Sequence, residues 1–365
     1  MAHKPGGRPS AGVLGLPGRD MCATVGRSGK GGMPAKILIV DDESRSRAAL
    51  EALLRREGYE VHDASDGTSA LTACISVQPD LILLDVLMPG MDGFEVCKRI
   101  KARPETRLTP VVLITGLSDA GDRIKGINAG ADDFLSKPID LNELLARTRS
   151  LIKLKQYTDE LEHAESVLFS LALSIEARDP YTRGHCDRLA KMSSRLGETL
   201  NLSGEDVTAL RRAGVVHDVG KIAVPDAILL KPGPLSAEEM EVVKKHPIVG
   251  EKICAPLKIF RPVLPIIRHH HERYDGSGYP DHLRSAEIPL TARILQLADV
   301  YDALTTDRPY RKADKPEVAL GIMDEEARRG WWDRDLLNAF REMIRNGGCP
   351  PATQEDAPGT RSSPA

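Results

Sequence analysis

The sequence predicts an α/β domain with a doubly wound, five-stranded parallel sheet, joined by a long helix to an all-α domain. Three observations lead to this fold class. The chain has 365 residues, which exceeds the usual size of one domain. Short apolar runs alternate with amphipathic helices over residues 35–150, as in a doubly wound sheet. From Leu141 onward almost every segment has the apolar spacing of a helix.

Each strand of the first domain is predicted from its own apolar run. Lys36–Val40, Leu81–Leu84 and Val111–Ile114 are almost continuously apolar, which indicates strands covered on both faces of a sheet. Tyr59–Ala64 and Phe134–Ser136 complete the set. Parallel strands need crossover connections, and the amphipathic segments between these runs are long enough to supply them as helices.

The long helix, residues 151–175, carries apolar side chains at alternating intervals of three and four. They are Leu154, Tyr157, Leu161, Ala164, Leu168, Leu171 and Ile175. This spacing favours a parallel coiled coil between two copies of the chain, and therefore a homodimer. The alternative is a single amphipathic helix that packs on its own domain. Further along, Ser236 and Glu239 form a capping-box pattern that predicts a helix start.

Composition limits the compartment and the partners. The net charge of −3 is small, so the chain as a whole does not carry the excess charge that would indicate binding to nucleic acid or to a membrane surface. The six cysteines show no paired spacing, which favours free thiols in a reducing cytoplasm. No apolar stretch approaches the roughly 20 residues that a membrane span needs.

Residues 1–32 and 347–365 are expected to be a disordered leader and tail. For the leader, a targeting peptide or basic arm is the alternative, although it lacks the apolar core of a secretory signal.

Polar side chains stand where the strands of the first domain end. Asp41 and Asp42 follow the first strand, Asp85 ends the third, Thr115 the fourth and Lys137 the fifth. Ligands of open parallel sheets bind at this edge. Three carboxylates suit Mg²⁺, which prefers oxygen ligands and phosphate. A carboxylate nucleophile at Asp85, with Mg²⁺ and Lys137 balancing charge, forms a phosphoryl-transfer site.

This joint pattern resembles the CheY-like receiver family over residues 35–152. The matching motifs are Val40-Asp-Asp-Glu43, Leu84-Asp-Val-Leu-Met-Pro-Gly-Met-Asp-Gly93, Ile114-Thr-Gly116 and Ala131-Asp-Asp-Phe-Leu-Ser-Lys-Pro138. The resemblance implies that a sensor histidine kinase supplies phosphoryl groups to Asp85. It also implies that Asp41 and Asp42 hold Mg²⁺, that Thr115 and Lys137 contact the phosphate, and that Phe134 is an aromatic switch.

Histidine and aspartate residues gather in or beside apolar helices of the second domain. They are His185, His217, Asp218, His246, His270, His271 and Asp299. A single buried histidine is more often a satisfied core residue, but ionisable groups on five segments favour a metal centre. Imidazole and carboxylate ligands together select iron, manganese, zinc or nickel.

The neighbouring residues His217 and Asp218 suggest two ions. On one helix their side chains would diverge by about 100°, so they cannot serve one ion equivalently. A bridging Asp218, with histidines on separate ions, suits that geometry, and two ions activate water and clamp a phosphoester. Lys221 lies one turn further and reaches the same phosphate. Asp218 and Lys221 are therefore the expected catalytic residues.

The second domain resembles the HD-GYP phosphodiesterases of the HD superfamily over residues 165–346. The signature is His217-Asp218, His270-His271-Glu272 and Gly278-Tyr279-Pro280. The resemblance implies that the histidines and aspartates named above, His185 among them, bind two transition-metal ions, with iron or manganese expected. It further implies hydrolysis of cyclic di-GMP to linear pGpG, to GMP, or to both.

Several residues near these motifs leave alternatives open. Arg308 and Arg311 match the positions that grip substrate phosphates, and the alternative is a solvated basic turn. Tyr181 stands where some family members have a glutamate for a third metal, which favours two ions here. Cys186 is expected to be a packed thiol rather than a ligand, and His269 a helix-face residue. The Gly-Tyr-Pro segment is expected to form a tight turn near the site mouth that could contact a partner.

The two halves together predict a regulated enzyme. Phosphorylation of Asp85 would shift a two-state equilibrium that the long helix carries to the metal domain, with either sign. One rival function is a catalytically silent cyclic di-GMP sensor or interaction module. Another is an HD phosphohydrolase for a different cyclic dinucleotide or nucleotide. A DNA-binding factor is disfavoured, because no basic recognition helix follows the first domain.

Overall fold

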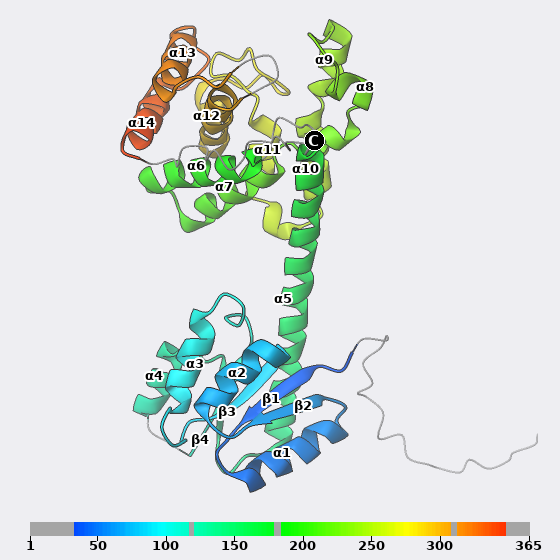
Figure 1. The fold of residues 1–365 in the computed structure, drawn as a ribbon, viewed down its shortest axis with the longest axis vertical. Helices are drawn as coiled ribbons and strands as arrows, with labels where there is room; N and C mark the ends of the chain where they lie inside the picture. The colour runs from blue at the N-terminus through cyan, green and yellow to red at the C-terminus, as the bar shows by residue number, and fades with distance from the viewer. Residues whose placement is uncertain (1–32, 117–119, 179–183, 308–311, 348–365) are drawn as a thin grey trace, which may run out of the picture. The chain divides into compact units, whose positions relative to one another are not determined.

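A computed structural model describes residues 33–116, 120–178, 184–307 and 312–347 (Figure 1). The chain divides into two compact units, with the boundary between Thr158 and Asp159. The predicted leader lies outside the described residues, as does the predicted tail after Gly347.

The first unit contains a parallel sheet. Its strands are β1 (Lys36–Val40), β2 (Glu60–Ala64), β3 (Leu81–Asp85), β4 (Val111–Thr115) and β5 (Asp133–Ser136). They lie in the order β2-β1-β3-β4-β5, and every neighbouring pair is parallel. This order is one of the common doubly wound arrangements. It confirms the predicted fold class of the first unit.

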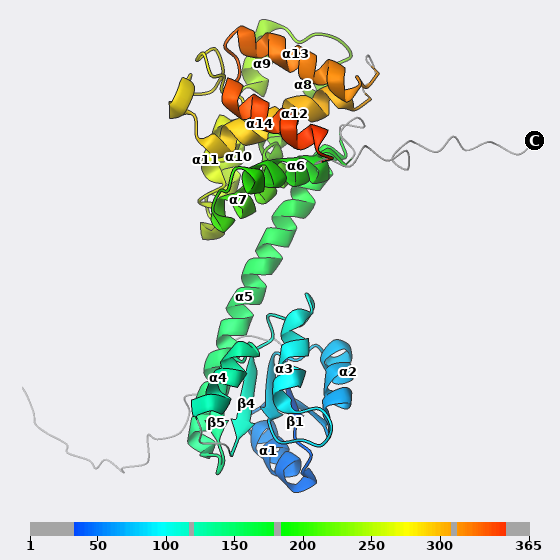
Figure 2. The same ribbon diagram turned by 90° about the vertical axis from the view of Figure 1, so that its left-hand side faces the viewer.

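Helices cover both faces of the sheet, as Figures 1 and 2 show for this unit. Side chains of α1 (Ser44–Arg56) and of the first part of α5 (Leu141–Glu176) share one apolar cluster with the sheet. Side chains of α2 (Gly67–Val77) and α3 (Gly93–Ala102) belong to the cluster on the other face, where α4 (Ala120–Asn128) also lies.

The alternation of side chains along β1 explains how one apolar strand serves both clusters. Ile37 and Ile39 join the α1 cluster, whereas Leu38 and Val40 join the α2 cluster, and all four are fully buried. Successive strand residues point to opposite faces. A strand covered twice must therefore be apolar throughout, which is why the continuous runs were informative.

The second unit is built from helices, and the part of it that the structure describes contains no strand. After the end of α5 come α6 (His185–Thr199), α7 (Gly204–Val216), η1 (Val219–Ala223), α8 (Asp226–Leu229), α9 (Ala237–Val243), α10 (His246–Cys254), η2 (Lys258–Phe260), α11 (Leu264–His269), η3 (Ser285–Glu287), α12 (Leu290–Thr305), α13 (Pro316–Arg328) and α14 (Arg334–Arg345). The all-α prediction is confirmed. The predicted capping box is present, with Ser236 as the N-cap of α9 and Glu239 as its partner.

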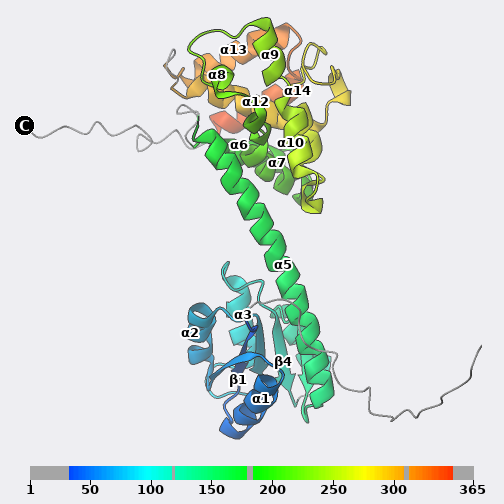
Figure 3. The same cartoon turned by 90° about the vertical axis from the view of Figure 1, so that its right-hand side faces the viewer.

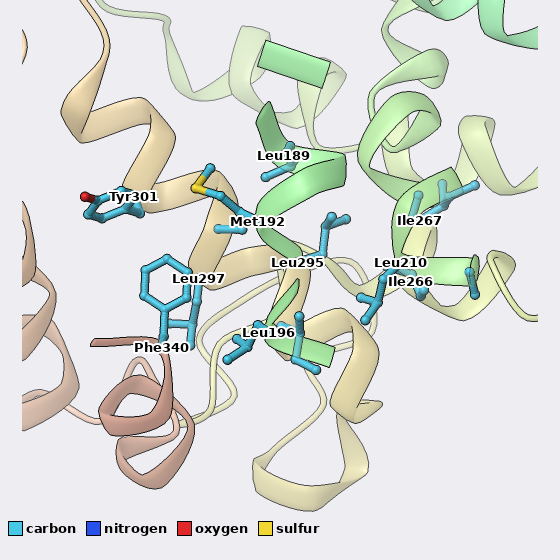
Figure 4. Close-up of a cluster of buried hydrophobic side chains, with 14 of the residues drawn as sticks. Leu189, Met192, Leu196, Leu210, Ile266, Ile267, Leu295, Leu297, Tyr301 and Phe340 are labelled. Atoms are coloured by element: carbon cyan, nitrogen blue, oxygen red, sulfur yellow. The ribbon is translucent and has the colours of Figure 1, made fainter. Parts of the chain in front are cut away.

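The core of this unit lies around α6, which packs on α7 and on α12 (Figure 3). Figure 4 shows Leu189 and Leu196 of α6 among Leu210, Leu295 and other apolar side chains. The helices α6, α7 and α12 pack closely through these apolar contacts. The polar residues at their ends are therefore held in fixed positions relative to one another. His185 at the start of α6 and His217 at the end of α7 are two of these polar residues.

The apolar seam of α5 has two different environments. Leu168 and Ile175 are buried in the core of the second unit, so the alternative of packing on its own domain holds for them. Leu154, Tyr157 and Leu161 remain 60%, 53% and 46% exposed.

Among the described residues, no helix combines the length and the apolar character needed to cross a membrane. The four described cysteines are buried free thiols, as predicted.

Candidate functional site

The first site lies at the carboxyl ends of the parallel strands. Asp41, Asp42 and Asp85 bring one carboxylate oxygen each within 4.8 Å of one another. The ammonium of Lys137 donates to Asp85 Oδ2 at 2.9 Å and lies 3.5 Å from Asp41 Oδ2. Thr115 ends β4 at the same edge. The structure thus places the predicted phosphorylation residues where the sequence predicted them.

At Asp85 and at Lys137, burial shifts the pKa in one direction and the neighbouring opposite charges shift it in the other. Burial raises the pKa of Asp85, against the hydrogen bond and charge of Lys137. Burial alone would lower the pKa of Lys137, but its contacts with Asp85 and Asp41 raise it. A lysine that stays charged beside a cluster of carboxylates leaves net negative charge, which fits a divalent cation. The Lys137–Pro138 peptide bond is cis.

The second site consists of two groups of side chains, most of them at helix ends, with Asp299 inside α12. Asp218, His246, His270 and His271 form one group, and His185, His217 and Asp299 form the other. In each group the candidate ligand atoms lie within 4.8 Å of one another. All seven residues predicted as metal ligands are therefore brought together.

The expectation that His217 and Asp218 share one helix is wrong. The helix α7 ends at Val216 with His217 as its C-cap, and Asp218 is the N-cap of the 3₁₀ helix η1. A Cβ on Gly220 would come within 1.9 Å of the His246 carbonyl, so η1 packs directly on α10. This close approach requires glycine. The Asp218 carboxylate lies between the groups, 3.3 Å from His217 Nε2 and 3.2 Å from His246 Nε2.

The hydrogen bonds of the imidazoles show that the site suits cations. Nδ1 of His246 and of His270 lie 2.8 and 2.7 Å from the carbonyls of Val243 and Ile267. A carbonyl only accepts, so each Nδ1 carries the proton and each Nε2 presents a lone pair. The two Nε2 atoms nevertheless face each other at 3.4 Å. In neutral rings these two lone pairs oppose each other, and a metal ion bound by both rings would satisfy them.

Two further atoms lead to the same conclusion. His217 Nε2 and Asp218 Oδ1 are buried, and although polar atoms lie 3.3 and 3.2 Å from them, neither makes a hydrogen bond within the described part of the chain. Nδ1 of His217 lies 3.3 Å from the Gly214 carbonyl, which again leaves Nε2 as the lone-pair atom. Buried polar atoms without partners are costly, and metal ligation relieves that cost. The donor set of imidazole nitrogen and carboxylate oxygen fits transition-metal ions.

The protonation states of these side chains also favour metal binding. Burial and the neighbouring histidines hold the pKa values of His270 and His271 well below the usual range. Burial opposes the charge of Asp218, but Lys221 and His217 lower the pKa of its carboxyl group. These shifts favour the neutral form of His270 and His271 and the ionised form of Asp218, which are the forms that bind metals. Lys221 donates a hydrogen bond to Asp218, as its predicted position near the site requires.

Sequence reasoning missed Asp302 and Arg188. Asp302 is 4% exposed and lies 2.7 Å from Nδ1 of His185 through its Oδ2 atom. Arg188 donates to Asp302 from Nε at 2.6 Å and from Nη2 at 3.0 Å. Burial opposes charge on His185, but Asp302 and Asp299 raise its pKa. The available signal was spacing, because Asp302 follows Asp299 by one turn of α12, and Arg188 follows His185 by one turn of α6.

Glu272 was quoted in the signature without a role, and the structure gives it a structural one. Its side chain is fully buried, and it accepts hydrogen bonds from the backbone N–H groups of Asp281 at 2.7 Å and Leu283 at 3.2 Å. The segment held in this way contains the Gly-Tyr-Pro turn. Tyr279 lies over His271, with 4.8 Å between ring centroids, and its N–H donates to the His271 carbonyl. The predicted position of the turn beside the site is confirmed.

We predict that Glu272→Gln lowers the free energy of unfolding by about 1–3 kcal/mol. The substitution replaces one of the two accepting oxygens by an NH₂ group, which is a donor and cannot accept the hydrogen bond of the backbone N–H that faces it. Chemical denaturation of the full chain measures this. Glu342→Gln, an exposed change on α14, is the control and is expected to have little effect. Equal stability of both variants would contradict the assigned role.

Three other expectations concern residues around the centre. Cys186 is a buried thiol whose Sγ lies 3.4 Å from the Val215 carbonyl, which agrees with a packing role. His269 ends α11 and pairs with Asp281 at 3.0 Å, outside both ligand groups. The substrate-binding candidates Arg308 and Arg311 lie outside the described residues, as does Tyr181.

An α/β unit with a phosphoryl-acceptor site, followed in one chain by a helical unit with a metal centre, defines a response regulator with a metal-binding output domain. Comparisons agree with this class. Residues 37–149 match the response regulator receiver domain, and residues 170–336 match the HD domain.

Several relatives cover most of the chain. The cyclic di-GMP phosphodiesterase response regulator RpfG of Xanthomonas campestris is 39% identical over 85% of this chain and 89% of its own length. A cyclic di-GMP phosphodiesterase of Thermotoga maritima is 35% identical over 84% of this chain and 90% of its own length. A 3′3′-cGAMP-specific phosphodiesterase 3 of Vibrio cholerae is 39% identical over 45% of this chain and 35% of its own length. The chain belongs to the response regulators that combine a receiver domain with an HD domain.

Proposed function

We propose that this response regulator hydrolyses cyclic di-GMP to pGpG, to GMP, or to both, under the control of phosphorylation at Asp85. The observation that carries the proposal is the opposed pair of imidazole lone pairs of His246 and His270, with Asp218 beside them. Such an arrangement suits metal ions rather than a packed core. The full-length similarity to named cyclic di-GMP phosphodiesterases supports the substrate.

Each of the candidate histidine ligands and Asp299 would bind one of two metal ions, and Lys221 would act beside them. His185, His217 and Asp299 hold one ion, His246, His270 and His271 hold the other, and Asp218 lies between the groups. Two iron or manganese ions would activate water and neutralise charge on the phosphodiester when bound. Lys221 keeps Asp218 ionised and oriented, and its ammonium adds positive charge for a phosphate oxygen.

The alternative substrate is another cyclic dinucleotide, since one relative is specific for 3′3′-cGAMP. Both substrates present the same kind of phosphodiester, so the metal residues do not separate them. The experiment is a comparison of kcat/KM for cyclic di-GMP, 3′3′-cGAMP and cyclic di-AMP with manganese-loaded protein. The proposal expects cyclic di-GMP to be preferred. A preference for another dinucleotide would move the function to that substrate, and binding of cyclic di-GMP without turnover would indicate a silent sensor.

In the receiver domain, Asp85 is the phospho-acceptor and Asp41 and Asp42 hold Mg²⁺. Lys137 already donates to Asp85 and is placed to balance the charge of a phosphoryl group, with Thr115 at the same strand edge. A sensor histidine kinase is the expected phosphoryl donor. The compartment is the cytoplasm, where the buried free thiols would stay reduced.

The exposed part of the α5 seam supports a homodimer. Leu154, Tyr157 and Leu161 keep the coiled-coil spacing, and about half of each side chain is exposed. We predict that Leu154→Glu with Leu161→Glu converts a dimer to monomers, measured by analytical ultracentrifugation. The matched control is Gln156→Glu with His163→Glu, which adds the same charge on exposed positions away from the seam. Dissociation by both pairs, or by neither, would contradict a dimer through this seam.

A further inference from the structure

Four side chains from α6 and α12 form a hydrogen-bonded cluster beside the metal centre. His185 and Arg188 come from α6, and Asp299 and Asp302 come from α12. His185 Nε2 lies 3.5 Å from Asp299, and its Nδ1 lies 2.7 Å from Asp302. Each helix therefore supplies two residues one turn apart, so that one imidazole is held from both sides.

His185 differs from three of the other candidate metal ligands, His217, His246 and His270, in what holds its Nδ1 atom. In His217, His246 and His270, Nδ1 faces a carbonyl of the residue three positions earlier, within the same segment. In His185, Nδ1 faces the Asp302 carboxylate, which belongs to a different helix. The orientation of this one ring thus depends on a tertiary contact and on a charged partner.

Arg188 in turn holds Asp302. Its Nε and Nη2 atoms donate to the two carboxylate oxygens at 2.6 and 3.0 Å, the fork geometry that suits a carboxylate. Nη2 also lies 3.3 Å from Thr306 Oγ1. Gly184, with a φ of +70°, precedes His185, and a Cβ there would lie 3.1 Å from Arg188 Nη1. Without this arginine the buried Asp302 carboxylate would lose the cation that compensates its charge and would keep only its contact with His185 among these partners.

We infer that Arg188 is a positioning residue that determines metal affinity at only one of the two positions, the one formed by His185, His217 and Asp299. The inference rests on the proposed two-ion centre. Arg188 fixes Asp302, and Asp302 presents the Nε2 lone pair of His185 to the ion. In the other position, formed by Asp218, His246, His270 and His271, the rings of His246 and His270 are oriented by the carbonyls of Val243 and Ile267 instead.

The test is the manganese content of the full-length protein after dialysis against graded concentrations of a chelator. Wild-type protein is expected to keep two ions per chain. Arg188→Gln is expected to lose one of them at about 10- to 100-fold lower chelator strength, the usual cost of losing an outer-shell partner, and to keep the other unchanged. The electron paramagnetic resonance spectrum would change from that of a coupled pair to that of an isolated ion.

Three variants keep the test decisive. Arg188→Lys retains the charge without the fork, so it should hold the second ion better than Arg188→Gln. The double variant Arg188→Gln with Asp302→Asn also removes the buried charge that Arg188 compensates, so its folding does not depend on the arginine, yet it should lose the second ion as Arg188→Gln does. Arg195→Gln, exposed on the same helix, should keep both ions.

The outcomes separate this inference from the proposed function. Wild-type protein with fewer than two ions would overturn the two-ion centre, and the inference with it. Two ions in wild type, with an unchanged chelator profile in Arg188→Gln or in the double variant, would overturn the inference and leave the proposed function standing. Equal loss of both ions in Arg188→Gln would also overturn it, because the effect would not be confined to one position.

Discussion

Asp218→Ala is expected to reduce the turnover of cyclic di-GMP by at least about 1,000-fold, because stabilisation by two ions contributes several kcal/mol to the transition state. The Asp218 carboxylate contacts histidines of both groups, at 3.3 Å for His217 and 3.2 Å for His246. Its removal should therefore disturb both ions at once. The measurement is kcat together with manganese per chain on the same preparation.

Asp335→Ala is the control, because Asp335 is an exposed carboxylate in the first turn of α14. It should retain wild-type turnover and metal content. Hydrolysis by Asp218→Ala at the wild-type rate would show that the reaction takes place elsewhere. Loss of turnover with two ions still bound would show that Asp218 is not shared between them.

Asp85→Asn is expected to abolish phosphoryl incorporation and with it the response of turnover to a phosphoryl donor. The amide keeps the shape of the side chain but cannot act as the nucleophile toward phosphorus. The measurement is labelled phosphate per chain after incubation with a small phosphoryl donor and Mg²⁺, followed by turnover with and without the donor. The sign of the wild-type response comes from the same experiment.

Asp63→Asn serves as the control for this prediction. Asp63 is an exposed carboxylate on β2 that pairs with Arg47 at the surface, so its loss should be nearly neutral. This variant should accept phosphate as wild type does. Phosphorylation of Asp85→Asn to the wild-type level would place the acceptor at a different residue.

The sequence allowed the sheet and the ligands to be predicted because their signals are local. A strand covered on both faces must be apolar along its whole length, so Leu81–Asp85 could be recognised without any knowledge of its neighbours. The clustering of the candidate metal ligands could be predicted for a similar reason. His246 and His270 stand beside apolar residues, where an ionisable group needs a partner.

The supporting residues could not be predicted because their partners are distant in the sequence. Nothing near Arg188 indicates that its guanidinium meets Asp302, since the contact exists only once α6 packs on α12. Glu272 likewise appears as part of a motif, and its role depends on the backbone N–H groups of Asp281 and Leu283. Such contacts follow from tertiary packing, which periodicity does not report.

The break between His217 and Asp218 was missed for a different physical reason. Val215, Val216 and Val219 continue the apolar character across the break, so the pattern reads as one helix. The signal was Gly220, whose missing side chain lets η1 approach the His246 carbonyl. The tight turn places the carboxylate between the two groups of histidines, as the helix-based argument had required of Asp218.

The most direct test of the two-ion phosphodiesterase is a titration of metal-free, full-length protein with Mn²⁺ under anaerobic conditions, with cyclic di-GMP turnover recorded at each step. The residues that carry the claim are the two ligand groups around Asp218. The account predicts negligible turnover with one ion per chain and a rise to full rate as the second binds. Full turnover in metal-free protein, or with a single ion, would contradict it.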